Sequence, residues 1–309
     1  MTVAFISHAD CGRHDTGWGH PEHVGRLRSI TRALRDRHEL FASVEHVEGR
    51  HATADELALV HATAYVERVE ALARAGGGRL DPDTVESEGS WDAATAAAGC
   101  ALDAVDMALD GRATRSFCAV RPPGHHAVRD RAMGFCLFGT AALAARWART
   151  RHGLDRVLIV DWDVHHGNGT QALVEEDSGI HFVSMHQWPW YPGTGAVDDR
   201  GNGNVWNRPM PAALPPEAYV STLQRAIDEA THGFTPDLVL ISAGFDSMRG
   251  DPLGGFTLEP EHLADLTRFL VERAERWCGG RVISVLEGGY DTQRLGIGCV
   301  EHIQALVTG

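Results

Sequence analysis

The sequence predicts a doubly wound α/β fold, in which a mostly parallel sheet carries helices on both faces. Short apolar, β-branched runs alternate with longer segments of helical periodicity along the 309 residues. The short runs lack polar alternation, which is typical of strands that are covered on both faces. A regular succession of strand and helix is typical of parallel sheets with crossover helices.

Six segments are the expected strands, each rich in Val, Ile, Leu or Phe: 2–6, 115–120, 156–161, 180–185, 236–242 and 281–286. Seven segments are the expected helices: 21–36, 64–75, 89–109, 134–151, 216–232, 260–277 and 292–307. The 89–109 segment is rich in alanine and spaces its apolar residues at i, i+3 and i+4, a helical pattern. Because the sequence shows no repeat or long linker, we expect residues 1–309 to form one domain.

Composition narrows the classes of function. The net charge of −14 argues against nucleic-acid binding and weakly favours a cationic substrate. No run of apolar residues is long enough to span a membrane, and the first ten residues do not resemble a signal peptide. The six cysteines are scattered without a CxxC pair, which predicts reduced thiols and a cytoplasmic protein.

Polar clusters follow five of the expected strands. They are RPPGHH after 115–120, DWDVHHGNG after 156–160, MHQ after 180–184, GFDS after 236–242 and EGGY after 281–286. In an open parallel sheet, ligands bind at the carboxyl ends of the strands. We therefore expect the five clusters to converge on one site.

Asp163 and His165 form a D-x-H pair whose side chains lie on the same side of an extended segment. Asp246 can add a third ligand from another strand end. Two carboxylates and one imidazole leave a coordination position for water, as catalytic zinc sites do, and such a set also accepts Fe²⁺. Alone, a D-x-H pair is more often a capped turn; the other four clusters favour the metal site.

The remaining polar residues can support such a centre. Asp161 lies one strand period before Asp163, so its carboxylate can orient an imidazole of the GHH segment. Asn168 can do the same for the other imidazole through its amide oxygen. Tyr290 can donate a hydrogen bond to a developing oxyanion, although GGY by itself reads as a turn carrying an aromatic lid.

The motifs RPPGHHA, GFC, DWDVHHGNGTQ, AGFDS, GDPLGG and LEGGY, in this order, resemble the zinc-dependent histone deacetylase family. The nearest branch is the class II-like bacterial one, with histone deacetylase-like amidohydrolases and acetylpolyamine amidohydrolases. HPEHVGRLRSI (20–30) and VHATAYVERV (60–69) resemble the family's N-terminal segments, so the likeness covers most of the chain. It implies a three-layer arginase/deacetylase fold with a sheet of about eight strands.

The resemblance also implies roles for single residues. It makes Asp163, His165 and Asp246 the zinc ligands, His125 and His126 the tandem catalytic histidines, and Tyr290 the residue that polarises the scissile carbonyl. Asp161 and Asn168 match the partners of the two histidines. Other branches carry Asp in place of Asn168, so His126 is expected to be less basic here.

Further positions match the substrate tunnel and a second ion. Phe135 and Tyr191 match the tunnel walls, with Gly134 and Leu253 beside them, and Asp83 or Asp81 matches an aspartate on the rim. Ser184, with Asp161, Asp163 and His165, matches a structural monovalent-cation site for K⁺. The other histidines of these segments, His20, His23, His166 and His186, are expected to be structural.

The implied activity is hydrolysis of an acyl-lysine or a related small-molecule amide by metal-activated water. An acetylpolyamine substrate is the alternative, but the position where polyamine-selective relatives place an acidic gatekeeper is the neutral Leu253. A binuclear arginase-like centre would need carboxylates at Gly167 and Met248. A non-catalytic acyl-lysine binding module would be expected to lack Tyr290 or a ligand. A homo-oligomer is compatible with the sequence.

Overall fold

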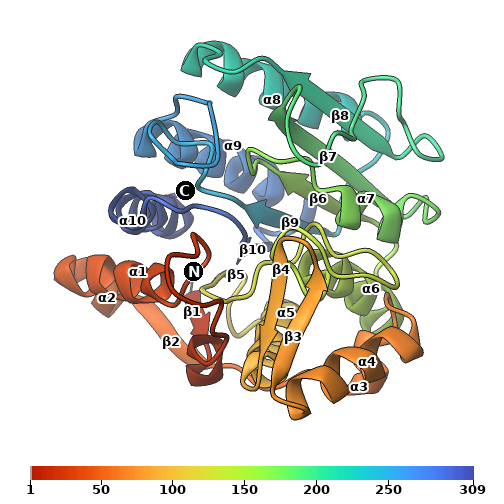
Figure 1. Cartoon of the computed structure of the whole chain (residues 1–309). Coiled ribbons are helices and arrows are strands. Elements are labelled where there is room, and N and C mark those ends of the chain that lie inside the picture. The colour runs from red at the N-terminus through yellow and green to blue at the C-terminus, as the bar shows by residue number, and fades with distance from the viewer. Residues whose placement is uncertain (1) are drawn as a thin grey trace.

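A computed structural model describes residues 2–309, in which eight parallel strands form one twisted sheet (Figure 1). Across the sheet the strands run in the order β2 (Val44–Glu48), β1 (Val3–Ser7), β5 (Arg115–Cys118), β10 (Val282–Leu286), β9 (Leu238–Ala243), β6 (Val157–Asp161), β7 (Ile180–Gln187) and β8 (Val205–Met210). The expected α/β class and the sheet of about eight strands are confirmed. The six expected strands are β1, β5, β6, β7, β9 and β10.

Helices cover both faces of the sheet. One face packs against α1 (Gly25–Asp36), α2 (His38–Ser43), α8 (Pro216–Ala230), α9 (Pro260–Cys278) and α10 (Thr292–Thr308). The other packs against α5 (Ser90–Leu109), α6 (Thr140–His152) and α7 (Asn168–Val174). The six inner strands between the two layers are almost fully buried, which explains their continuous apolar sequences.

A smaller layer lies outside α5 and α6. It contains α3 (Ala54–Leu57), α4 (Thr63–Arg74) and an antiparallel hairpin of β3 (Gly77–Asp81) and β4 (Thr84–Ser87). These elements share a core with α5 and α6 through Leu57, Tyr65 and Leu143. A short 3-10 helix, η1 (Ala9–Gly12), follows β1.

The structure differs from the sequence-based expectation in several elements. The edge strands β2 and β8, the hairpin β3–β4 and the short helices α2, α3 and α7 were not expected. The helix expected from residue 134 begins at Thr140, because Gly134 and Phe135 have positive φ angles of 57° and 68°. The helix expected from residue 21 begins at Gly25. None of the helices in residues 2–309 is long and apolar enough to cross a membrane.

Candidate active site

The five polar clusters meet at the carboxyl edge of the sheet, where strands β5, β6, β7, β9 and β10 end. Asp163 and His165 follow β6, and Asp246 follows β9, the strand paired with β6. One ligand atom of each of these three residues lies within 4.8 Å of the other two. All three side chains are buried. The topology therefore brings together residues that are far apart in the sequence.

The donor set of this cluster fits a divalent metal ion. Oδ2 of Asp246 is buried and lacks a hydrogen-bond partner among residues 2–309. It lies 3.4 Å from Nδ1 of His165, which in turn lies 3.0 Å from Oδ1 of Asp163. A carboxylate oxygen without a partner is costly in the interior, and a cation would remove that cost. Two carboxylates and one imidazole are ligands that suit zinc.

The charges within the cluster also favour a cation. Burial and the charge of Asp163 raise the pKa of Asp246 to about 7. Burial alone would lower the pKa of His165, but its hydrogen bond with Asp163 and the nearby carboxylate of Asp246 raise that pKa to about 10. A proton on His165 thus supplies positive charge where a metal ion would bind. Metal binding would have to displace that proton.

The backbone of the neighbouring strands holds the two carboxylates. Oδ2 of Asp163 accepts a hydrogen bond from the Gly288 N–H at 2.8 Å, and Oδ1 of Asp246 accepts one from the Val164 N–H at 2.9 Å. A Cβ at Gly288 would overlap the Asp246 carboxylate, so only glycine fits this position. The loop after β10 therefore holds Asp163 and leaves room for Asp246, which is itself held by the segment after β6.

The two adjacent histidines have different partners. Nδ1 of His125 lies 2.9 Å from Oδ2 of Asp161, whereas Nδ1 of His126 lies 2.8 Å from Oδ1 of Asn168. An amide oxygen only accepts, so His126 donates its Nδ1–H to Asn168 and leaves Nε2 as a free base. The two imidazole rings are 4.0 Å apart.

These partners give the two histidines opposite pKa shifts. Burial alone would lower the pKa of His125, but the carboxylates of Asp163 and Asp161 outweigh it and hold that pKa well above its usual value. Burial, together with the nearby His125 and His165, holds the pKa of His126 well below its usual value. His125 is therefore the charged member of the pair and His126 the neutral one.

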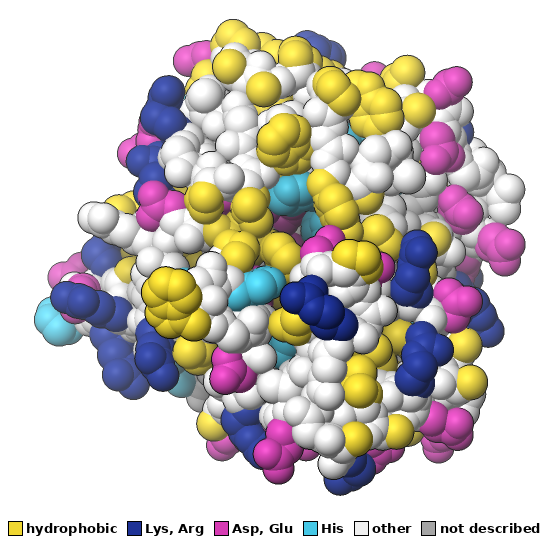
Figure 2. Space-filling view, viewed as in Figure 1, with side chains coloured by type: hydrophobic (Ala, Val, Ile, Leu, Met, Phe, Trp, Pro, Cys, Tyr) yellow, Lys and Arg dark blue, Asp and Glu magenta, His cyan; other side chains and the backbone are white. Residues whose placement is uncertain are grey.

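A cavity of about 230 Å³ leads from the surface to this cluster. Its walls are largely aromatic, and it is lined by Asp83, His126, Gly134, Phe135, His165, Trp190, Tyr191, Leu253 and Tyr290. The rings of Phe135 and Tyr290 are 5.9 Å apart and nearly perpendicular. Figure 2 shows hydrophobic side chains around a hollow with histidine inside it. Asp81, the other candidate for the rim, is not among the lining residues.

The hairpin β3–β4 holds one wall of this cavity. Asp83 accepts a hydrogen bond from the Gly134 N–H at 3.0 Å, and Thr84 accepts one from the Phe135 N–H, also at 3.0 Å. A Cβ at Gly134 would overlap the ring of His126, so the turn can approach that ring only with glycine. His20 packs edge-on against Phe135 with ring centroids 4.7 Å apart, and so supports the same wall.

Two residues that the sequence did not single out position Tyr290. Arg26 donates its Nε–H to the Gly289 carbonyl at 2.7 Å, and its guanidinium lies 5.1 Å from the centre of the tyrosine ring. Oδ2 of Asp251 accepts hydrogen bonds from the N–H groups of Tyr290 and Asp291 at 2.6 and 3.2 Å. Both side chains are buried. Their only signal in the sequence was membership of the HPEHVGRLRSI and GDPLGG segments.

The residues expected to hold a second cation also lie together. Ser184 of β7 is the direct neighbour of Asp161 of β6 in the parallel register. Ser184 Oγ lies 3.0 Å from Nδ1 of His186, whose Nε2 lies 3.0 Å from the Gly195 carbonyl oxygen. His166 is held by Thr194 and Gln171. His166 and His186 thus have protein partners on both ring nitrogens, as structural histidines do.

The fold thus places a cluster that could hold a metal ion at the inner end of a narrow, largely aromatic cavity. The histone deacetylase domain matches residues 20–306, and the chain belongs to that family. A histone deacetylase-like amidohydrolase of Pseudomonas aeruginosa is 39% identical over 87% of this chain and 71% of its own length. A probable deacetylase of Methanothermobacter thermautotrophicus is 38% identical over 99% of this chain and 90% of its own length.

A solved structure supports the same assignment. The crystal structure of the HDA15 HD domain superposes with a TM-score of 0.93 at 35% sequence identity. The match covers 99% of this chain and 88% of that one. The resemblance inferred from the sequence motifs is therefore confirmed, and the chain is a deacetylase-type hydrolase.

Proposed function

We propose that this protein is a zinc-dependent amidohydrolase that removes acetyl or other acyl groups from acyl-lysine or a related small-molecule amide. The observation that carries the proposal is the arrangement at the inner end of the 230 Å³ cavity. There a buried Asp–His–Asp cluster, a neutral histidine and a tyrosine face the same space. The aromatic walls suit the aliphatic stem of an acylated lysine, whose amide would reach the cluster.

Asp163, His165 and Asp246 would hold the metal. A bound zinc ion would lower the pKa of water and withdraw electrons from the acyl oxygen. The same ligands would accept Fe²⁺, and a K⁺ ion beside Asp161 and Ser184 would brace the loop that carries the ligands.

The side chains of the protein supply the proton transfers. Nε2 of His126 accepts a proton from the attacking water, and the hydrogen bond from Nδ1 to Asn168 fixes the tautomer that makes this possible. The same nitrogen then gives the proton to the leaving amine. General acid–base help of this kind contributes about 10²–10⁴-fold. His125, paired with Asp161, keeps its charge and stabilises the negative charge that develops beside it.

Tyr290 completes the site. Its hydroxyl donates a hydrogen bond to the oxygen of the acyl group as negative charge develops there. One well-placed donor of this kind contributes about 3–4 kcal/mol. Arg26 and Asp251 hold the loop that carries the ring, so that the hydroxyl is oriented before substrate arrives.

The lining of the cavity favours acyl-lysine over acetylpolyamine. Among its described lining residues, Asp83 is the one acidic side chain, and it is already engaged with the Gly134 N–H. Leu253 offers no charge to a polyamine. The six unpaired cysteines favour a reducing compartment such as the cytoplasm.

One substrate panel tests this function. Purified protein is assayed with acetyl-lysine peptides, longer acyl-lysines, acetylputrescine and acetylspermidine, and its bound metal is measured in parallel. We expect turnover of acyl-lysine with about one zinc per chain. Preference for the acetylpolyamines would support the alternative substrate, and binding of acyl-lysine without turnover would support a non-catalytic module.

A further inference from the structure

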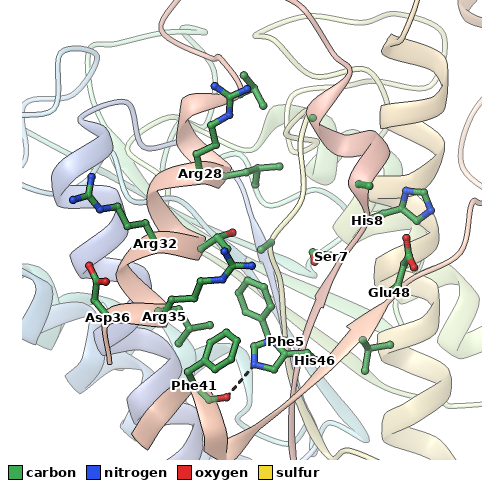
Figure 3. Close-up of a pocket in the computed structure, with 18 residues that line it drawn as sticks. Phe5, Ser7, His8, Arg28, Arg32, Arg35, Asp36, Phe41, His46 and Glu48 are labelled. Atoms are coloured by element: carbon green, nitrogen blue, oxygen red, sulfur yellow. Dashed lines mark hydrogen bonds between the residues drawn. The ribbon is translucent and has the colours of Figure 1, made fainter. Parts of the chain in front are cut away.

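A second and larger hollow, of about 870 Å³, lies along α1 above the carboxyl ends of β1 and β2 (Figure 3). It shares no lining residue with the active-site cavity. Its floor comes from β1, β2 and η1, and its wall comes from α1 and from Phe41 of α2. The volume is in the range of small-molecule and cofactor sites. We call this hollow the α1 groove.

The topology gives the α1 groove a particular position in the sheet. In the sheet, β2 lies next to β1 on one side and is reached through α1. The next strand of the sheet along the chain, β5, lies next to β1 on the opposite side. Strand order thus reverses between β1 and β5, and ligands of open α/β sheets bind at such points. The α1 groove lies beside this point, mostly over β1 and β2, and Ala119 is its one lining residue from the β5 side. The candidate active site occupies the corresponding position between β6 and β9, where the order reverses again.

Positive charge gathers on the α1 wall of the groove. Arg28, Arg32 and Arg35 line it and are spaced so that the first and last lie about 10 Å apart along the helix axis. Among residues 2–309, no acidic side chain pairs with any of the three, whereas Arg26 and Arg37 of the same segment pair with Glu22 and Glu301. In Figure 2 dark-blue side chains gather at the left, over α1 and α2. Asp36 lines the same wall, but the three arginines outnumber it, so on a chain of net charge −14 this wall would favour an anion.

Aromatic side chains form one end of the groove. The rings of Phe41 and His46 are 4.1 Å apart, and Phe5 lies 5.7 Å from His46. Nε2 of His46 lies 3.0 Å from the Phe41 carbonyl oxygen, which holds the imidazole in place. Figure 3 shows Arg35 reaching from α1 toward these rings, while Arg32 points the other way. A planar group placed here would contact both an aromatic face and a guanidinium.

An acidic side chain stands opposite the arginines. Glu48 is the last residue of β2, and Figure 3 shows it with His8 on the side of the groove away from α1. In β-α-β units that bind nucleotides, an acidic residue at the end of the second strand accepts hydrogen bonds from the ribose hydroxyls. Glu48 has the corresponding place at the end of β2, although residues 8–24, and not a short glycine-rich turn, join β1 to α1. The likeness is therefore limited to the position of the carboxylate.

We propose that the α1 groove binds a nucleoside phosphate. The base lies between Arg35 and the rings of Phe41 and His46, Glu48 accepts hydrogen bonds from the ribose hydroxyls, and Arg28 binds the phosphates. This site is separate from the proposed hydrolase activity and does not depend on it.

Calorimetric titration of the metal-loaded protein with ADP, adenosine and pyrophosphate tests the proposal. We expect saturable ADP binding that is tighter than the binding of either fragment. Arg28→Glu should weaken ADP binding at least about tenfold, as expected for loss of a charge-assisted contact. Glu48→Gln should weaken ADP but leave pyrophosphate unchanged. The control is Arg276→Glu, which reverses an exposed charge on α9 and should leave ADP binding unchanged.

Several outcomes would overturn the proposal. Absence of ADP binding at millimolar concentration would exclude the site. If pyrophosphate bound as tightly as ADP, the base and the ribose would make no contribution to binding, which contradicts the contacts proposed for them. If Arg28→Glu and Arg276→Glu weakened ADP binding equally, only the net charge of the protein would matter for binding. ADP binding that survives Arg28→Glu would place the nucleotide elsewhere, for example on the metal. Thermal unfolding of each variant without ligand shows whether the variant is folded.

Discussion

His126 donates its Nδ1–H to the amide oxygen of Asn168 at 2.8 Å, and this neutral partner sets it apart from the neighbouring histidine. A carboxylate in place of the amide would stabilise the imidazolium and raise the pKa of His126. The unprotonated form of His126 is the one that can accept a proton from water. In Asn168→Asp, the fall in kcat/KM on the acidic side of the pH profile (the acidic limb) should therefore move to higher pH by about one unit. The measurement is a pH–rate profile on an acetyl-lysine amide. Asn202→Asp, an exposed change of equal charge, is the control and should not move the limb.

The roles proposed for the histidine pair and the metal ligands can be separated by a single substitution. His126→Ala removes the base but none of the three ligand atoms of the cluster. Turnover should fall about 10²–10⁴-fold while the metal content stays at that of the wild type. Metal analysis and steady-state kinetics on the same preparation check this. Loss of the metal in this variant would instead make His126 a ligand.

Asp251 should act on the reaction through Tyr290. Replacing it with Ala frees the N–H groups of Tyr290 and Asp291 and lets the tyrosine loop move, so kcat should fall about 10²-fold with little change in KM. The test is a double-mutant cycle with Tyr290→Phe. If Asp251 only positions the tyrosine, the double variant should be no slower than Tyr290→Phe alone. Additive losses, or a loss of metal, would point to a general structural role.

Removal of the metal should destabilise the protein, because Asp246 Oδ2 then lacks a partner. A ligand that binds the native state adds about 2.7 kcal/mol when its free concentration is a hundred times Kd. We therefore expect chelation to lower the thermal unfolding temperature and added Zn²⁺ to restore it. Asp246→Ala serves as the control and should not respond to Zn²⁺. An unfolding temperature that is the same with and without chelator would contradict a buried metal centre.

Glu86 on β4 should make stability depend on pH. Both of its carboxylate oxygens are buried without a partner among the residues described, and burial raises its pKa to about 8. The folded state therefore holds a proton that the unfolded state releases above about pH 4.5. The contribution of Glu86 to the free energy of unfolding is therefore greatest below pH 4.5. It falls as the pH rises to about 8 and stays low above that.

Glu86→Gln should remove this fall. At pH 9 the variant should be more stable than the wild type by a few kcal/mol, and at pH 4 about equal to it. Urea unfolding at the two pH values measures the difference, and Glu45→Gln, an exposed change on β2, is the control. If wild type and Glu86→Gln show the same pH dependence, Glu86 is not the titrating group.

The central strands and their polar ends could be predicted because burial on both faces leaves continuous apolar runs. The edge strands could not. β2 has the sequence VEHVE, with most of its side chains exposed, and so lacks the apolar signal of the six inner strands. β8 follows a long turn-rich segment and carries Pro209 in its second half. Edge strands pair on one side only, so their sequences are less constrained.

The residues that shape the tunnel were harder to predict than those around the metal. Asp163, His165 and Asp246 follow strands whose order fixes where they meet. The contact between Asp83 and Gly134, by contrast, joins residues 51 positions apart through a side chain and a backbone N–H. No periodicity in the sequence encodes such a contact. The hairpin that carries Asp83 was missed because its strands, GGRLD and TVES, are short and contain few apolar residues.

Gly288 limits which parts of the site can change in sequence during evolution. Its N–H is bonded to Asp163 and its missing side chain leaves room for Asp246, so the inner wall of the centre is backbone rather than side chain. Substitutions there would disturb the ligands before they altered the fit of a substrate. Substrate specificity can therefore change through substitutions of the residues that line the cavity, Trp190, Leu253 and Asp83, while the Asp–His–Asp cluster stays the same.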